Sequence, residues 1–400
     1  MQDLFDKSNF VYYRKNPDAV FFDNASTTHI HDCVLEKFLD YYSGYRASPG
    51  RGGYTDVDLA TQAVDKARTQ VANYLDVAPE QILFTTGATQ GLNWIANWNN
   101  HLPGNVFISD MEHNSNLVPW LSQGRTHHQG LEVLFHSEGL ARCLNQAVRS
   151  NDKLGLVSLT TKSNLTGYQP DWQQTLIMAK TFSHITCLDY SQSIMIEPPP
   201  MGFLRDNVDY AVFSGHKMFG PTGIGVLYVR DLPEHKPIYG GGGMVSDAGF
   251  NGFKLHTGLD VHQAGTPDTA GIIGMGMCCE LANWYGERYA ERLSEIWHDM
   301  TDLGLYDIPD LIYLSDTKNV NNIISVTSDK FHVSDLATLL NEQGVSVRHG
   351  KMCAYPYANN LLRYQDDASM LRISTAPYND YDDCKKLVHA INQSIHTLTQ

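Results

Sequence analysis

The sequence predicts an α/β protein with a large domain built on a mostly parallel sheet and a smaller α+β domain after it. Short apolar runs alternate with helix-like segments through the first 230 residues, and this pattern changes after residue 270. The chain has 400 residues, of which 42% are hydrophobic and 18% charged, as in a globular protein. This length is sufficient for two domains with a large core.

The expected strands of the large domain are short runs rich in apolar and β-branched residues. They are VFFD near 20, ILFTT near 82, NVFISD near 105, LEVLF at 131–135, LGLVSLT near 154, HITCLD near 184, DYAVFS near 209 and IGVLYV near 224. Helix-like segments such as DLATQAVDKARTQVANYL and TQGLNWIANW separate several of them. This alternation favours parallel strands covered by helices on both faces.

The second domain is expected from a different order of elements. A long helical pattern over 271–303 precedes the runs NIISVTS, SDLATLLNEQG, VSVR and LRIST, and a final helix is expected near 380–397. We therefore expect the large domain over 21–275, the small domain over 276–400, and an N-terminal segment over 1–20 that joins the small domain. The glycine run YGGGGM at 239–244 predicts a flexible loop.

Charge and cysteine content exclude several classes of function. A formal net charge of −15 disfavours binding to nucleic acid or to anionic membranes. The N-terminus lacks a signal-peptide pattern, and the tract AGIIGMGMCCELANWYG contains Glu280 and predicts a buried helix rather than a membrane span. The seven cysteines include no C-x-x-C pair, which predicts reduced thiols, no structural zinc or other metal site, and a cytoplasmic location.

Two features of the large domain favour an anionic ligand beside a carboxylate. TTGATQGLN at 85–93 follows an expected strand and begins a helix, where free backbone N–H groups favour an anion. An ordinary capped helix start without a ligand would have the same sequence pattern. Asp189, in CLDYSQ, ends a strand, which is where ligands bind in open α/β sheets. Taken alone, Asp189 could equally be a helix cap or half of a structural ion pair.

Two further features add an amine and an imidazole. Lys217, in VFSGHKMFGP, lies one strand after Asp189 with Ser214 and His216 beside it, and a desolvated lysine there is a usable nucleophile or base. His113, in DMEHNSN, follows another strand end and could stack on a planar ring, although a lone histidine is more often structural. Together the four features match pyridoxal phosphate, which needs a lysine for its imine, a carboxylate for its ring nitrogen and a phosphate cradle.

The motifs resemble those of the class V aminotransferase group of pyridoxal-phosphate enzymes with the type I fold, and of its cysteine desulfurase/selenocysteine lyase branch. The resemblance covers nearly the whole chain and implies a seven-stranded, mostly parallel sheet in the large domain. Its motifs are FFDNASTT, SPGRGGYT, TTGATQGLN, DMEHNSNLVPW, TKSNLTG, LDYSQ, SGHKMFGPTGIGVLYV, QAGTPDTAG and VRHGKMCAYP, which follow in family order.

The resemblance implies a role for each matching residue. Lys217 would carry the cofactor and move the Cα proton, Asp189 would hold the ring nitrogen, and His113 would stack on the ring. Thr266, with Gly265, would reach the phosphate of a neighbouring subunit, which implies a homodimer with shared sites. Beside these, the family pattern places Gln192 and Asn164 at the ring hydroxyl, Ala88, Thr89, Ser214 and His216 at the phosphate, and Ala25 and Asn164 beside the substrate.

The second domain would choose the substrate. Arg348 and Arg372 match the family's arginines near the substrate carboxylate, and a surface salt bridge is the alternative, chiefly for Arg348. Cys353 occupies the position of the family's nucleophilic cysteine, where its thiolate would take sulfur from L-cysteine as a persulfide and leave L-alanine. Lys351 and His349 beside it would lower its pKa. The alternative is an ordinary loop thiol.

The sequence departs from the family pattern around that cysteine and leaves the reaction open in part. Close relatives often have histidine before the cysteine, where this chain has Lys351 and Met352, and ANNLLRYQDDASM is longer than their corresponding run. Selenocysteine lyase, cysteine-sulfinate desulfinase and other C–S lyases are alternatives with the same cofactor, and a scaffold that retains the fold is a non-enzymatic one. The sulfur acceptor and the pathway, such as iron–sulfur cluster assembly or tRNA thiolation, stay open.

Overall fold

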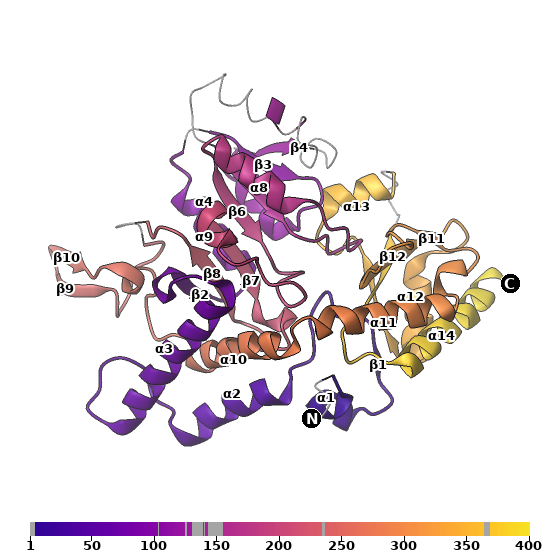
Figure 1. The fold of residues 1–400 in the computed structure, drawn as a ribbon, viewed down its shortest axis with the longest axis horizontal. Coiled ribbons are helices and arrows are strands. Elements are labelled where there is room, and N and C mark those ends of the chain that lie inside the picture. Colours follow the sequence, from indigo (N-terminus) through magenta and orange to yellow (C-terminus); the bar gives the residue numbers. More distant parts are fainter. Residues whose placement is uncertain are drawn as a thin grey trace.

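The computed structural model describes residues 5–102, 104–124, 126–129, 139, 141–142, 155–233, 237–363 and 369–400. It has a large sheet with its covering helices beside a second, smaller sheet with helices of its own (Figure 1). The longer helices at the N-terminal end of the chain lie with the large sheet, and the C-terminal helix lies with the small one.

The central sheet of the large part has seven strands in the order β2-β8-β7-β6-β5-β3-β4. Among them only β8 is reversed, since it pairs antiparallel with both β2 and β7 while the other pairs are parallel. The strands are β2 (Ile82–Thr85), β3 (Val106–Ser109), β4 (Thr126–Gln129), β5 (Leu156–Thr160), β6 (Ile185–Asp189), β7 (Tyr210–Ser214) and β8 (Gly225–Val229). The predicted seven-stranded, mostly parallel sheet is confirmed.

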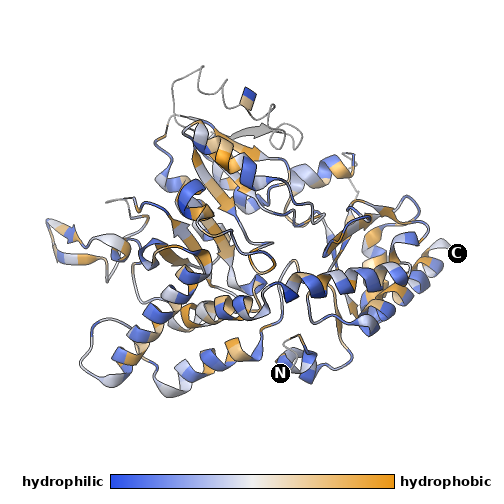
Figure 2. Ribbon diagram, viewed as in Figure 1, coloured by the Kyte–Doolittle hydropathy of each residue, from blue (hydrophilic) through white to orange (hydrophobic). Residues whose placement is uncertain are grey.

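Helices cover both faces of this sheet, which explains why its strands read as continuous apolar runs. Adjacent residues of one strand belong to different apolar clusters: Phe84 and Phe213 pack in one, Leu83 and Val212 in the other. The covering helices are α2 (Asp32–Gly44), α3 (Thr55–Leu75), α4 (Ala88–Trp98), α5 (Val118–Leu121), α8 (Trp172–Thr181), α9 (Phe203–Asn207) and α10 (Thr269–Tyr285). Apolar residues concentrate on the strands and polar residues on the outward helix faces (Figure 2).

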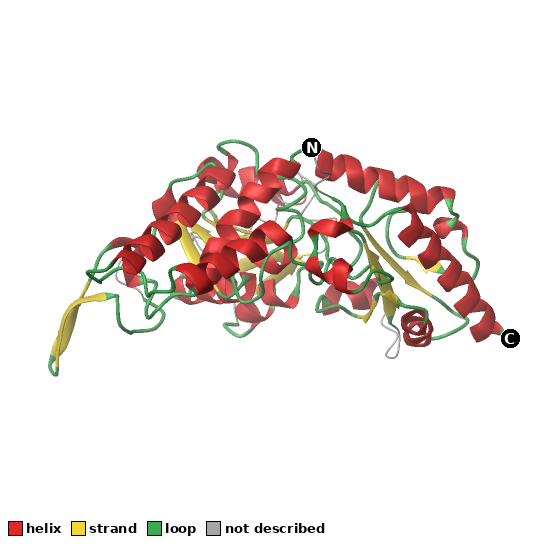
Figure 3. Ribbon diagram, turned by 90° about the horizontal axis from the view of Figure 1, so that it is seen from below, coloured by secondary structure: helices red, strands yellow, loops and turns green. Residues whose placement is uncertain are grey.

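The smaller part has an antiparallel sheet in the order β11-β12-β15-β14, with a separate apolar cluster beneath its helices. Its elements are α11 (Arg288–Asp302), β11 (Ile312–Tyr313), β12 (Ile323–Thr327), α12 (Val333–Glu342), β13 (Val345–Ser346), β14 (Arg348–Gly350), α13 (Tyr355–Leu361), β15 (Met370–Ser374) and α14 (Tyr381–Thr399). Near the N-terminus lie α1 (Val11–Lys15) and β1 (Val20–Phe21). The hairpin of β9 (Val245–Gly249) and β10 (Gly252–Leu255) projects from the far end of the large part (Figure 3).

The structure corrects two sequence expectations. The VFFD run does not join the large sheet, because β1 pairs in parallel with β13 of the smaller part. The single long helix expected over 271–303 is two helices, since Gly286 adopts φ 52 and ψ −142 and ends α10 before α11 begins. The LEVLF strand and Cys143 lie outside the described residues, and the boundary at residue 275 stays a prediction.

The described part of the chain contains six cysteines, all of them free thiols. No group of three or more His, Cys, Asp or Glu side chains there could hold a metal ion. Among its helices, none combines the length and the apolar character needed to cross a bilayer.

Candidate active site

A cavity of ≈ 240 Å³ lies where the carboxyl ends of the central strands face the smaller sheet. All but one of the residues expected at the site border it. These are Ala25, Ala88, Thr89, His113, Asn164, Asp189, Gln192, Ser214, His216, Lys217, Arg348, Cys353 and Arg372. The exception, Thr266, is exposed and lies apart from this lining, so its expected place beside a neighbouring subunit stays a prediction.

Lys217 brings a buried amine to the cavity. It ends a short 3-10 helix (η4, Gly215–Lys217) that follows β7 directly, next to β6 in the sheet. Among the described residues its amine has no hydrogen-bond or ion-pair partner, and burial lowers its pKa to about 8 despite the opposing attraction of Asp189. At pH 7 about a tenth of such amines are neutral, far more than for an ordinary lysine.

Asp189 is the last residue of β6 and is 5% exposed. Its Oδ1 accepts the backbone N–H of Ser191 at 3.1 Å, and it forms no ion pair within the described part of the chain. A buried carboxylate without a cation is costly. Asp189 is therefore suited to a ligand that carries a proton or a positive charge.

The start of α4 forms a cradle beside Lys217. Gly87 caps the helix with φ 149, a conformation that favours glycine. The Ala88 N–H donates to Ser214 Oγ at 2.9 Å, and Thr89 Oγ1 lies 2.7 Å from Ser115 Oγ. N–H groups and hydroxyls at a helix N-terminus are a site for an anion.

His113 is held as a neutral ring. Its Nδ1 accepts the Ser115 N–H at 3.1 Å, so the ring proton belongs on Nε2. Burial, and then Lys217, lower its pKa to about 4. The preceding Glu112 is buried, accepts hydrogen bonds from Ser109, Asn116 and the Thr160 N–H, and fixes the loop that carries the ring.

Gln192 and Asn164 donate to backbone carbonyls, and His216 is a neutral ring. Gln192 Nε2 donates to the Ala25 carbonyl at 2.9 Å, and Asn164 Nδ2 donates to the Met352 carbonyl at 2.8 Å. Burial lowers the pKa of His216 to about 4, which keeps that ring neutral at pH 7. The first two contacts join LDYSQ to FFDNASTT and TKSNLTG to VRHGKMCAYP around one cavity.

Cys353 reaches the same cavity from the smaller part and is exposed. Met352 and Cys353 both have positive φ, at 36° and 56°, which is strained for residues with a side chain. The turn is tied on both sides, by Asn164 to Met352 and by the Asn114 N–H to the Cys353 carbonyl at 2.6 Å. A thiol on such a fixed turn is well placed to react.

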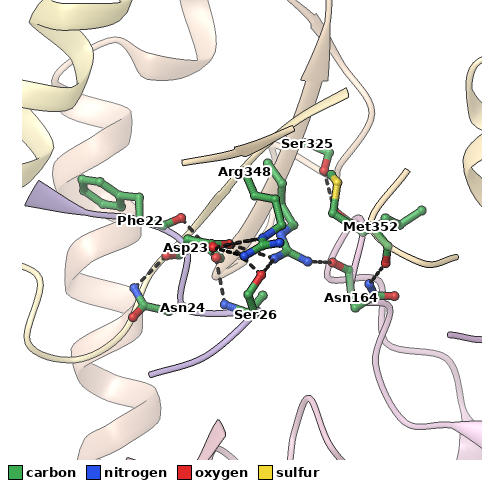
Figure 4. A network of polar contacts seen from close by, with 12 residues as sticks. Phe22, Asp23, Asn24, Ser26, Asn164, Ser325, Arg348 and Met352 are labelled. Atoms are coloured by element: carbon green, nitrogen blue, oxygen red, sulfur yellow. Dashed lines mark hydrogen bonds and ion pairs between the residues drawn. The ribbon is translucent and has the colours of Figure 1, made fainter. Parts of the chain in front are cut away.

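The two arginines share one carboxylate (Figure 4). Arg348 donates from Nε and Nη2 to Asp23 at 2.8–3.0 Å, and its side chain is 49% exposed. Arg372 is 2% exposed and donates to Asp23 Oδ1 at 3.0 Å, to Ser26 Oγ and to the Asn164 carbonyl. Both arginines therefore form ion pairs with Asp23, and their expected place beside a substrate carboxylate stays a prediction.

Sequence reasoning missed residues that lie inside motifs it had identified. Asp23 and Ser26 are in FFDNASTT, and Ser115 is in DMEHNSN. Lys162, in TKSNLTG, borders the cavity, while its Nζ donates to Asn322 Oδ1 at 2.5 Å across the junction of the two parts. A charge directly after a mostly apolar run, VFF for Asp23 and LGLVSLTT for Lys162, was the available signal.

Comparisons with known proteins agree with this arrangement. A family model described as Aminotransferase class-V matches residues 20–387. A cysteine desulfurase of Shigella flexneri is 30% identical over 388 residues, which cover 94% of this chain and 93% of that protein, and one of Escherichia coli K12/DH10B gives the same values.

Solved structures are similar over almost the whole chain. The E. coli cysteine desulfurase CsdA, in an S-sulfonic acid form, has a TM-score of 0.83 and 26% identity, with 98% of both chains covered. The apo cysteine desulfurase of Thermococcus onnurineus NA1 has a TM-score of 0.84 and 24% identity, with 96% of both chains covered, and supports the fold alone.

Proposed function

This chain belongs to the class V aminotransferase family, in its cysteine desulfurase branch, and on that premise we propose that it is a cysteine desulfurase. It converts L-cysteine to L-alanine and takes the sulfur as a persulfide on Cys353. The single observation that carries the proposal is the meeting of Lys217, Asp189 and Cys353 at one cavity, although the three come from separate segments of the chain.

The family depends on pyridoxal phosphate, and the groups around the cavity fit that cofactor. Lys217, buried and without a bonded partner among the described residues, would bind its carbonyl carbon. Asp189 would face the ring nitrogen and His113 the ring. The phosphate would be bound by Ala88, Thr89, Ser214 and His216. The ring hydroxyl would be contacted by Gln192 and Asn164.

When bound, pyridoxal phosphate supplies an aldehyde that combines with the substrate amine and a ring that withdraws electrons from Cα. Lys217, with its pKa near 8, takes the proton from Cα and returns it. Asp189 would keep a proton on the ring nitrogen of the bound cofactor, and His113 would remain neutral because its pKa is about 4. Ala25 lies beside the substrate, and Arg372, with Arg348 at the rim, orients the substrate carboxylate.

Cys353 carries out the sulfur transfer. Its Sγ attacks the substrate Sγ, so that an S–S bond forms while the substrate Cβ–Sγ bond breaks. The electron pair stays with the carbon fragment, which takes up a proton and leaves as L-alanine. Thiol plus L-cysteine thus gives persulfide plus L-alanine, and the step needs neither an oxidant nor a reductant.

The experiment compares L-alanine formation from L-cysteine by the wild-type holoenzyme and by Cys353→Ala. The proposal expects L-alanine from the wild type and a loss of at least 100-fold in the variant, whose bound cofactor keeps its absorbance. Equal L-alanine from both proteins would remove Cys353 from the mechanism and favour selenocysteine lyase, sulfinate desulfinase or another C–S lyase.

The assembly and the partners are part of the proposal. A homodimer is supported by large apolar side chains left exposed on α2 and at the start of α3, namely Leu39, Tyr42, Tyr54 and Leu59. A protein acceptor for the persulfide is supported by the exposure of Cys353. The cytoplasmic location and a role in iron–sulfur cluster assembly stay predictions.

A further inference from the structure

Ser115 connects the cradle at the start of α4 with the His113 ring. It lies in a short 3-10 helix, η3 (Asn114–Asn116), and borders the cavity. Its Oγ is 2.7 Å from Thr89 Oγ1 and 3.0 Å from His113 Nδ1. The Ser115 hydroxyl therefore links the phosphate end of the proposed cofactor site to the residue that would face the cofactor ring.

The Ser115 hydroxyl has one proton and two neighbours at hydrogen-bond distance, so two arrangements of the protons are open to it. His113 Nδ1 accepts the Ser115 backbone N–H at 3.1 Å, so this nitrogen carries no proton and can only accept. In one arrangement Thr89 donates to Ser115, and Ser115 donates to Nδ1. In the other arrangement Ser115 donates to Thr89, which leaves the Thr89 proton free for a ligand. The ring keeps its bond to the Ser115 N–H in both.

An anion beside α4 favours the second arrangement, because the Thr89 proton then points at the negative charge. Ser214 follows the same pattern, since its Oγ accepts the Ala88 N–H at 2.9 Å and keeps its own proton for a ligand. Ala88 has no hydroxyl to offer. Besides backbone N–H groups, the cradle therefore offers the Thr89 and Ser214 hydroxyls, and each of them is oriented in advance by a donor from a neighbouring residue.

We propose that Ser115 is a positioning residue that orients the Thr89 hydroxyl toward the phosphate of the cofactor. This inference rests on the proposed function, because it takes pyridoxal phosphate as the ligand. Removal of the Ser115 hydroxyl should weaken only a cofactor that carries the phosphate, and only while the Thr89 hydroxyl is present. A purely structural role for Ser115, as a support of the loop that carries His113, would weaken the cofactor with and without its phosphate alike.

The experiment titrates the cofactor-free protein with pyridoxal phosphate and with pyridoxal, which has a hydroxyl in place of the phosphate. The absorbance of the bound cofactor gives the two dissociation constants, so the result does not depend on turnover. Ser115→Ala should raise the Kd for pyridoxal phosphate about 3- to 10-fold, as expected for the loss of one hydrogen bond, and leave the Kd for pyridoxal unchanged. Ser122→Ala makes the same chemical change at an exposed position at the end of α5, outside the cavity lining, and should change neither constant.

A second pair of variants tests whether Ser115 acts through Thr89. Thr89→Val keeps a similar shape without the hydroxyl, so it should itself raise the Kd for pyridoxal phosphate. Adding Ser115→Ala to Thr89→Val should then change this Kd by less than about twofold, because the hydroxyl that Ser115 orients is already absent.

The outcomes are distinguishable from those of the proposed function. A wild-type protein that develops no absorbance band with pyridoxal phosphate would overturn the proposed function. Normal binding by the wild type, with a Ser115→Ala variant that raises both constants alike or neither of them, would overturn only the role of Ser115. An effect of Ser115→Ala that is equally large with and without the Thr89 hydroxyl would do the same. A phosphate-dependent loss that disappears in the Thr89→Val background supports the proposal.

Discussion

Replacing Lys217 by methionine should make the cofactor-free protein more stable at pH 7. The amine is buried, has no bonded partner among the described residues, and has its pKa lowered from 10.5 to about 8, first by burial. At pH 7 most folded molecules therefore carry a protonated Lys217 amine in a buried site, which is unfavourable for a charge. Methionine has a similar length and no charge, so it removes this cost while filling the same space.

The magnitude follows from the pKa difference. Each pKa unit corresponds to about 1.4 kcal/mol, so the lowered pKa costs about 3 kcal/mol of folding free energy when the amine is protonated in both states. Because the pKa is lower in the folded than in the unfolded state, this cost is fully present below pH 8. Above pH 8 the amine of the folded protein is neutral, and the cost falls as the pH approaches 10.5, where the unfolded chain loses its proton too.

Urea unfolding of the cofactor-free proteins between pH 6.5 and 10.5 measures this difference. The gain of Lys217→Met over the wild type should be largest at and below pH 8 and approach zero near pH 10.5. Lys66→Met removes the same charge from an exposed position of α3 and should change the free energy of unfolding by less than about 0.5 kcal/mol. A Lys217→Met protein that is less stable than the wild type at pH 7, or whose gain does not depend on pH, would refute the reasoning.

Three other substitutions test separate parts of the site. Asp189→Ala should keep some cofactor binding but lower kcat for L-alanine formation about 100-fold or more. Near-normal turnover would mean that another residue is the partner of the ring nitrogen. Arg372→Gln should raise the KM for L-cysteine about 10- to 100-fold, because hydrogen bonds to the charged substrate carboxylate are lost. An unchanged KM in steady-state assays would contradict the binding of that carboxylate by Arg372. Gly225→Ala would place a Cβ 2.6 Å from the Gly87 Cα and should therefore displace the cradle at the start of α4. We expect cofactor affinity, measured by absorbance titration, to fall at least about tenfold. Gly53→Ala, with open space around it, is the control.

The strands of the large sheet could be predicted from the sequence because they are buried on both faces. A strand between two helical layers is buried on both faces, and β5 to β8 accordingly appear in the sequence as mostly apolar runs. Asp189 and Lys217 stand out because each places a charge at the end of such a run. The expected cavity residues met at one edge because parallel strands bring their carboxyl ends together.

The sequence alone determined the α/β class, the order of the strands along the chain and the chemical groups offered at their ends, since these depend on local periodicity and on single charges. Only the tertiary structure decided that β1 joins β13, and that Asp23 binds Arg348 and Arg372, which lie 325 and 349 positions away. No local pattern encodes such pairs, because the attraction acts between opposite charges that only the finished fold brings together.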